Sequence, residues 1–346
     1  QGMTIVAIAD TLLEGVMRTR FHAEPIIQAT ELLLQERAPR DVAVAHPWAT
    51  EGASAARLDN NEPMGSRRFI SAHQPTPATH ILSNGRYATM LTAAGSGYSR
   101  WRDCAVTRWR EDATCDNHGS YIFLRDVDSG AVWSAGFQPS GVEADDYAVT
   151  FHEDRAEFVR RDGALTTTLE ILVSTEGDAE VRRVSITNSG SRTRTLDITS
   201  YAELVLAPQA ADIAHPVFSN LFIETEYLAD MGAILATRRR RAPSEPEIWA
   251  AHLAVVEGEA IGEVVSEPEI ETNRMRFLGR GHDIRTPIAV IDGPALSNTV
   301  GTVLDPIFAL RRRARIAPGA VVRIAFWTEV ASSREALLDG LVTRRD

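Results

Sequence analysis

The stretch that decides the fold is Asn84–Ser134, NGRYATMLTAAGSGYSRWRDCAVTRWREDATCDNHGSYIFLRDVDSGAVWS. Two strand-like runs within it, Tyr87–Thr92 and Tyr121–Asp126, each stop at a turn rich in Gly, Ser or Asp. The segment between them is predicted to be a loop that combines aromatic rings with Arg and Asp side chains. Such a loop suits a sugar, which has apolar C–H faces and hydroxyl edges. The same residue types also anchor contacts between domains, so both interpretations stay open.

Composition bounds the protein class. The chain has 346 residues, 44% of them hydrophobic and 24% charged, which is typical of a soluble globular protein. Its net charge of −11 argues against nucleic acid as a partner. All of its basic residues are arginine. Without lysine, neither a Schiff-base enzyme nor a P-loop nucleotide site is available.

Neither a metal nor an organic cofactor is predicted. Cys104 and Cys115 lie eleven positions apart and could form one disulfide, but reduced thiols are the default expectation. His118 is the one further ligand type nearby, and no zinc-site spacing results. The sequence has no apolar run of 18 residues or more, so no direct membrane insertion by this segment is expected.

The chain divides by pattern into four parts. Residues 1–37 show helical spacing and 38–79 show no period, as expected of an extended linker. Residues 80–330 contain ten or more short alternating runs between Gly, Asp, Asn or Pro turns, which predicts a mainly β fold, a large antiparallel sandwich. One short helix or none is expected within 258–306. Residues 331–346 begin a linker helix, with Ser332 and Glu335 at the spacing of a capping box.

The ends of the chain suggest a larger parent. Helical pattern is already present at Gln1-Gly2-Met3, and a helix begins just before Asp346. We therefore expect this sequence to be a piece of a longer polypeptide.

The site hypothesis concerns the aromatic loop. We expect Trp101 to be at least partly exposed beside Arg102 and Asp103, with a ring stacked on a pyranose and the charged groups on its hydroxyls. The alternative is that the tryptophans are core or interface anchors. The candidate carbohydrate-binding residues are Tyr98, Trp101, Arg102, Asp103 and Trp109.

The sequence gives a weaker signal for catalytic residues than for a sugar-binding loop. Glycoside hydrolysis needs two carboxyl groups facing one pocket, and Asp116, Asp145-Asp146 and Glu153-Asp154 give no matched pair. Arg125-Asp126 is interpreted as a structural ion pair at a strand end. An enzyme of the mutarotase type would need a His and a carboxylate in the sandwich, for which the candidates are His152 with Glu170 or Asp197.

Several of these segments resemble a known family. NGRYATMLTAAGSGYSRWRD from Asn84, YIFLRDVDSGAVWS from Tyr121 and Phe137-Gln138-Pro139 resemble the amino-terminal β-sandwich of glycoside hydrolase family 94. That family includes cellobiose and chitobiose phosphorylases and part of the cyclic β-1,2-glucan synthases. Residues 1–37 are similar to the end of the glycoamylase-like domain of those synthases.

The resemblance implies a galactose-mutarotase-like β-supersandwich within a bacterial inner-membrane glycosyltransferase, with this domain itself cytoplasmic or unassigned. In the phosphorylases the catalytic acid lies in a helical barrel after the sandwich, so no catalytic residue is carried over. The implied role is a non-catalytic carbohydrate-binding or scaffold domain. Its implied partners are a glucan or gluco-oligosaccharide and the neighbouring domains. A mutarotase-type enzyme and a purely structural spacer are the alternatives.

Overall fold

The computed structural model describes residues 2–28, 65–74, 76–110, 116–243, 245–257, 263–264 and 266–345. The chain forms two compact units, Gln1–Glu62 and Pro63–Asp346. In the first unit, helices α1 (Gly2–Leu12) and α2 (Val16–His22) confirm the helical pattern of the opening residues. Residues 29–37 of the predicted helical segment 1–37, and most of the linker 38–79, lie outside the described residues. The described end of that linker contributes strand β1 (Arg67–Phe69).

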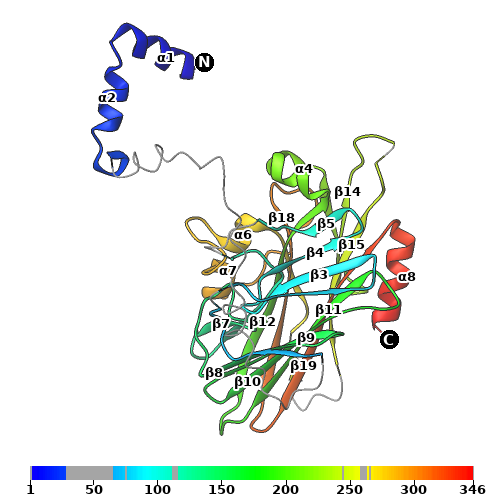
Figure 1. The fold of residues 1–346 in the computed structure, drawn as a ribbon. Coiled ribbons are helices and arrows are strands. Elements are labelled where there is room, and N and C mark those ends of the chain that lie inside the picture. Colours follow the sequence, from blue (N-terminus) through cyan, green and yellow to red (C-terminus); the bar gives the residue numbers. More distant parts are fainter. Residues whose placement is uncertain are drawn as a thin grey trace. The chain divides into compact units, whose positions relative to one another are not determined.

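The second unit contains two large antiparallel sheets, which confirms the mainly β class (Figure 1). The nine-stranded sheet has the order β1, β8 (Asp146–Phe151), β9 (Arg155–Asp162), β10 (Leu165–Val173), β11 (Ala179–Asn188), β19 (Val321–Ala331), β15 (Trp249–Val256), β14 (Ala233–Arg238), β13 (Ile223–Leu228). The ten-stranded sheet has the path β16 (Glu263–Val264), β18 (Pro306–Ile316), β12 (Arg194–Ala207), β5 (Cys104–Thr107), β4 (Gly97–Trp101), β3 (Tyr87–Thr92), β2 (Thr79–Ser83). Off this path, β17 (Glu269–Asn273) pairs with β18, and β6 (Tyr121–Asp126) joins β12 to β7 (Val132–Ser134).

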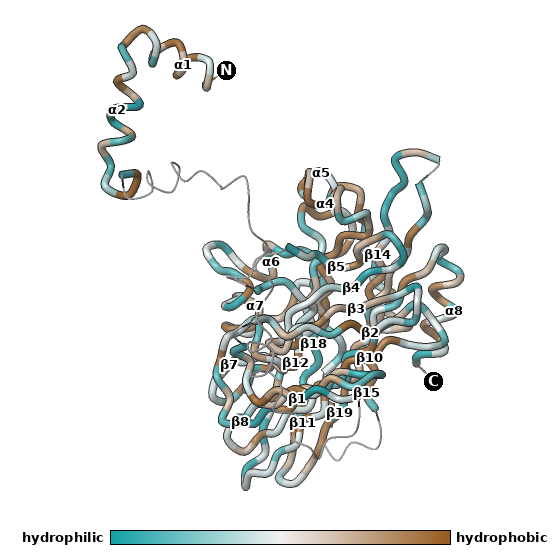
Figure 2. Tube along the Cα trace, viewed as in Figure 1, coloured by the Kyte–Doolittle hydropathy of each residue, from teal (hydrophilic) through white to brown (hydrophobic). Residues whose placement is uncertain are grey.

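The core lies between the two sheets and follows the two-residue period of the strands. In β9 and β10, buried residues alternate with half-buried ones along most of each strand. Phe158 and Leu169 lie opposite each other in register and share one buried cluster with Leu91 and Leu310 of the other sheet. Figure 2 shows both hydrophobic and hydrophilic residues along the strands, as this half-buried arrangement requires.

Four short helices interrupt the sandwich. They are α4 (Gln209–Ala214), α5 (Pro216–Asn220), α6 (Arg274–Leu278) and α7 (Ile288–Ile291). The expectation of one helix or none within 258–306 is therefore wrong. These helices have four to six residues each, too few for a helical period to appear in the sequence. Local capping and packing define them instead: the Asn273 side chain accepts a hydrogen bond from Met275 N, and Phe277 packs on Tyr201.

The predicted C-terminal helix is present as α8 (Arg334–Arg345). Its cap is Ser333, whose hydroxyl accepts a hydrogen bond from Ala336 N, and not Ser332 of the predicted capping box. Leu337 and Leu341 are fully buried in a cluster with residues of β14 and β15, so α8 is packed on the sandwich. Within the described ranges, no helix is long and apolar enough to cross a membrane.

Candidate functional site at the β4–β5 hairpin

The segment predicted to be an aromatic loop begins as a β-hairpin. Along β4 the side chains alternate, with Ser99 and Trp101 buried while Tyr98 is half-buried and Arg100 is exposed. Trp101 is only 3% exposed, so the expectation of a partly exposed indole is wrong. The physical reason is the two-residue period of a strand, which places Trp101 on the inner face with Ser99.

Trp101 is held in a fixed position by polar contacts. Its Nε1–H donates to Asp178 Oδ2 over 2.6 Å. The other carboxylate oxygen of Asp178 accepts from Arg86 Nε over 2.8 Å. The Arg102 guanidinium lies over the indole, 4.5 Å from the ring centroid, in a cation–π contact. Asp178 therefore ties the hairpin to the turn between β10 and β11.

The two residues between β4 and β5, Arg102 and Asp103, are both exposed. Arg102 has φ of 52°, a left-handed conformation that is rare for residues other than glycine, asparagine and aspartate. Its backbone N–H donates to Arg86 O over 2.7 Å, which helps to hold it there. Strained backbone of this kind is concentrated at functional sites.

This turn forms the rim of a cavity of about 440 Å³. Its volume falls within the range of about 300–1,000 Å³ that is usual for small-molecule sites. The walls come from the β4–β5 turn, the β10–β11 turn, the end of β19 and α8. The lining includes Arg86, Trp101, Arg102, Glu176, Asp178, Glu329, Ser332 and Arg344.

Glu329 is the buried acid of this cavity, at 6% exposure. Burial raises the pKa of its carboxyl group, and the Arg344 guanidinium offsets this only in part. Arg344 Nε lies 3.4 Å from Glu329 Oε2, an ion pair without hydrogen-bond geometry. Arg344 is held by stacking on Trp327 and by a 3.1 Å bond to Ser174 Oγ. Among the described residues, Glu329 Oε2 is shielded from solvent, is ion-paired with Arg344 and has no hydrogen-bond donor within bonding geometry.

The other two predicted residues lie elsewhere. Tyr98 at the start of β4 and Trp109 after β5 pack together, with ring centroids 5.5 Å apart. Both are half-buried. Arg108 beside them is paired with the half-buried Glu203 and the buried Asp212. The structure thus divides the five candidates into Trp101, Arg102 and Asp103 at the turn, and Tyr98 with Trp109 at the opposite end of the hairpin.

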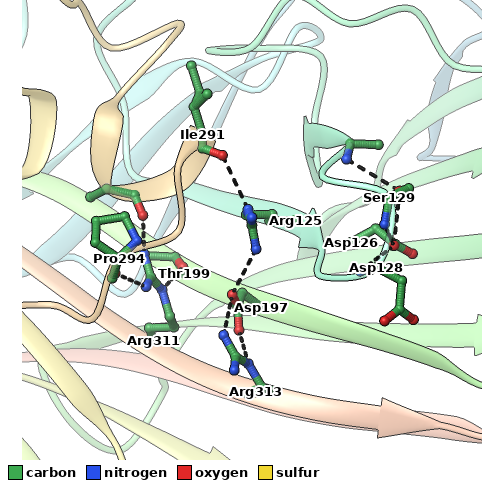
Figure 3. A network of polar contacts seen from close by, with 12 residues as sticks. Arg125, Asp126, Asp128, Ser129, Asp197, Thr199, Ile291, Pro294, Arg311 and Arg313 are labelled. Carbon is green, nitrogen blue, oxygen red and sulfur yellow. Dashed lines mark hydrogen bonds and ion pairs between the residues drawn. The ribbon is translucent and has the colours of Figure 1, made fainter.

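Arg125 and Asp126 both make structural contacts, but the predicted ion pair between them is wrong: Arg125 pairs with Asp197 at 3.7 Å (Figure 3), and Asp126 pairs with Arg194 at 2.6 Å. Asp126 accepts bonds from the backbone N–H and the hydroxyl of Ser129, which closes the turn after β6. Arg125 Nε donates to Ile291 O over 3.3 Å, which joins this strand to α7. The family-specific stretch from Arg125 to Gly130 thus serves a turn and a helix contact in this structure.

The mutarotase-type candidates are not brought together. Asp197 is 1% exposed and is held by Arg313 at 2.6 Å, on β12 of the ten-stranded sheet. Glu170 lies on β10 of the other sheet, 3.5 Å from Arg183. Between His152 and either carboxylate, the described residues show no hydrogen bond or ion pair. The described residues also contain no cluster of three or more potential metal ligands.

The expectation of reduced thiols at Cys104 and Cys115 remains a prediction, because Cys115 lies outside the described residues. The Cys104 side chain is half-buried, and this burial raises the pKa of its thiol.

Sequence reasoning missed the acids of the cavity. Asp178 was visible only as a turn residue in Glu176-Gly177-Asp178, and the sequence does not show that this turn meets Trp101. Glu329 had a clearer signal, because it is a single acid within the otherwise apolar end of β19. An acid in such a position is rarely buried unless it is paired or functional.

The chain is similar in sequence to known proteins of carbohydrate metabolism. The family described as "Glycosyl hydrolase 94, supersandwich domain" matches residues 64–344. The chain is 42% identical over 337 residues to the cyclic beta-(1,2)-glucan synthase NdvB of Rhizobium meliloti, covering 97% of this chain and 12% of that protein. It is 27% identical over 272 residues to the N,N'-diacetylchitobiose phosphorylase of Vibrio furnissii, covering 77% of this chain and 32% of that protein.

Among solved structures, a galactose mutarotase-like protein from Clostridium acetobutylicum matches 78% of this chain and 98% of its own. The TM-score is 0.40 and the identity is 7%. In length, the chain spans about an eighth of the synthase NdvB and about a third of the diacetylchitobiose phosphorylase.

Proposed function

Because the chain belongs to the glycosyl hydrolase 94 supersandwich-domain family, we propose that it is a non-catalytic carbohydrate-binding domain of a cyclic β-(1,2)-glucan synthase. Its ligand is a glucan or gluco-oligosaccharide, and its other partners are the neighbouring domains of the parent chain. The parent is associated with the bacterial inner membrane. The 42% identity to NdvB over nearly the whole chain supports this assignment.

The observation that carries the proposal is the cavity at the β4–β5 turn. It combines an indole edge, exposed guanidinium groups and a buried carboxylate oxygen without a hydrogen bond. A sugar presents both hydroxyl donors and acceptors, so Glu329 can accept from one hydroxyl while Arg102 or Arg86 donates to another. The strained turn at Arg102 places its guanidinium at the rim of the cavity.

The same cavity argues for binding over hydrolysis. Glycoside hydrolysis uses two carboxyl groups, one as acid and one as base or nucleophile. Both oxygens of Asp178 already accept hydrogen bonds, from Trp101 and Arg86. Within the described lining, Glu329 is then the buried acid that is ion-paired with Arg344 but makes no hydrogen bond, which suits recognition of a hydroxyl.

The test replaces Arg102 with glycine. Glycine adopts positive φ freely, so Arg102→Gly removes the guanidinium and keeps the turn. The probe is a linear β-1,2-linked glucotetraose, titrated into the full chain while the indole N–H resonance of Trp101 is followed by NMR. We expect millimolar affinity for the parent protein, which corresponds to about −4 kcal/mol. Arg102→Gly should weaken binding at this resonance at least fivefold without lowering the melting temperature.

Arg100→Ala is the matched control, because Arg100 is an exposed arginine of the same hairpin that does not line the cavity. It should bind like the parent protein. If Arg102→Gly binds the tetraose as tightly as Arg100→Ala does, the cavity is not the glucan site.

A further inference from the structure

A second, smaller cavity lies at the opposite end of β4, beside the turn that joins β3 to β4. Its volume is about 190 Å³. Thr92, Ala93 and Ala94 form one side, and Phe137 and Gln138 form another. This turn and the Phe137-Gln138 segment are fixed to each other, since Gln138 N–H donates to Ala94 O over 2.8 Å. The cavity shares no lining residue with the one at Trp101.

Gln138 is the unexplained residue of this cavity. Its side chain is 8% exposed, and its Oε1 atom has no hydrogen-bond partner among the described residues. Burying an unpaired amide oxygen costs about 1–3 kcal/mol, and native proteins carry few such groups. A buried acceptor without a donor, on a residue that lines a cavity, can accept a hydrogen bond that a ligand supplies.

Asp116 provides a second acceptor in the same cavity. It has φ of 41°, a left-handed conformation like that of Arg102. Thr92 Oγ1 lies 3.3 Å from Asp116 Oδ2, and Ser96 Oγ donates to the backbone carbonyl of Asp116 over 2.5 Å. These contacts hold Asp116 at the cavity wall. Partial burial raises the pKa of its carboxyl group, which is consistent with a site that is shielded from water.

The remaining lining defines the ligand class. Ala72, Pro77, Ala78, Ala93 and Phe137 give apolar walls. The one other charged group, His73, is bonded to Glu143 through its Nε2 over 2.6 Å. An anion would meet acceptors on both sides. A cation of the metal type would lack the cluster of ligands that it needs, at least among the described residues.

We propose that this cavity binds one neutral, hydroxyl-rich ring of the size of a single glucosyl residue. Gln138 Oε1 and Asp116 accept hydrogen bonds from its hydroxyls, and Phe137 packs against its C–H face. A volume below the usual range of about 300–1,000 Å³ limits the ligand to one ring. The proposal rests on a different cavity from the proposed function, so either can fail alone.

The test titrates methyl β-D-glucopyranoside into the full chain and follows the backbone amide resonance of residue 138, which Gln138→Leu retains. Gln138→Leu keeps the shape and removes the amide. Because the Oε1 atom has no hydrogen-bond partner to lose, we expect Gln138→Leu to melt at or above the temperature of the parent protein. Glucoside binding should fall at least fivefold. Arg102→Gly should leave this binding unchanged, which separates the two cavities.

Asp116→Asn distinguishes the ligand classes, since asparagine tolerates the left-handed backbone and retains the acceptor. For a neutral ring, it should weaken binding by a few fold only. Ethylammonium is the competing probe. The proposal is overturned if ethylammonium, and not the glucoside, shifts the Gln138 resonances. It is also overturned if Gln138→Leu binds the glucoside like the parent protein, or if it melts lower, which would make Gln138 a structural residue.

Discussion

Trp101 shows at the scale of one residue how a ring can line a site and still belong to the core. It is 3% exposed and is a member of the main buried cluster. Replacing a buried aromatic side chain with alanine typically costs about 3–5 kcal/mol. We expect Trp101→Ala to lower the free energy of unfolding by that amount, measured by urea denaturation. Trp109→Ala is the control and should cost clearly less, because Trp109 is half-buried. A Trp101→Ala protein as stable as Trp109→Ala would contradict the placement of the indole.

His252 predicts a pH dependence of stability. Its ring is buried, with Ser200 Oγ 2.8 Å from Nε2 and Thr328 Oγ1 3.0 Å from Nδ1. Burial, assisted by the nearby Arg182 charge, lowers its pKa to about 4 from 6.5. Because the folded state resists the proton, this contribution to stability is complete above pH 6.5. It is lost as the pH falls from about 6.5 to about 4.

At about 1.4 kcal/mol for each pKa unit, the loss amounts to about 3 kcal/mol. We expect His252→Gln to remove this part of the pH dependence, as measured by urea unfolding at pH 7 and pH 4.5. His282→Gln changes an exposed histidine and should keep the wild-type slope. If the free energy of unfolding changes equally with pH in both variants, the His252 ring is not held neutral by burial.

At the scale of elements, the sequence predicted the sheets better than the contacts between them. The alternation along runs such as Leu165–Val173 follows from a strand with one face buried, so those strands could be found without a structure. The same alternation places Trp101 inside, but the charged residues around the turn favour a loop when only the sequence is read. Asp178 bonds to Trp101, and Glu329 lines the same cavity, only because distant elements pack together, which the local sequence does not encode.

The N-cap of α8 also differs from the one that the sequence predicts. Ser332 and Glu335 have the spacing of a capping box, yet Ser333 makes the observed bond to Ala336 N. Loss of a serine cap costs about 0.5–2 kcal/mol. We expect Ser333→Ala to destabilise the protein by about 1 kcal/mol in thermal or urea unfolding, while Ser332→Ala should have a smaller effect. A larger loss for Ser332→Ala would restore the capping box that the sequence suggested.

At the scale of the whole molecule, the division into two compact units predicts that the sandwich is stable by itself. In α1, no residue is buried. A chain limited to residues 63–346 should unfold in one cooperative transition within about 2 °C of the full chain, as measured by calorimetry. Loss of the transition, or a much lower midpoint, would mean that residues 1–62 complete the fold.

The central claim is that the cavity between the β4–β5 turn and α8 holds a glucan. A crystal structure of the full chain with a β-1,2-linked glucotetraose at tens of millimolar tests this most directly. We predict a sugar ring that contacts Trp101 and Arg102, with one hydroxyl donating to Glu329 Oε2. Sugar bound only elsewhere on the domain, with this cavity filled by water at saturating ligand, would contradict the account.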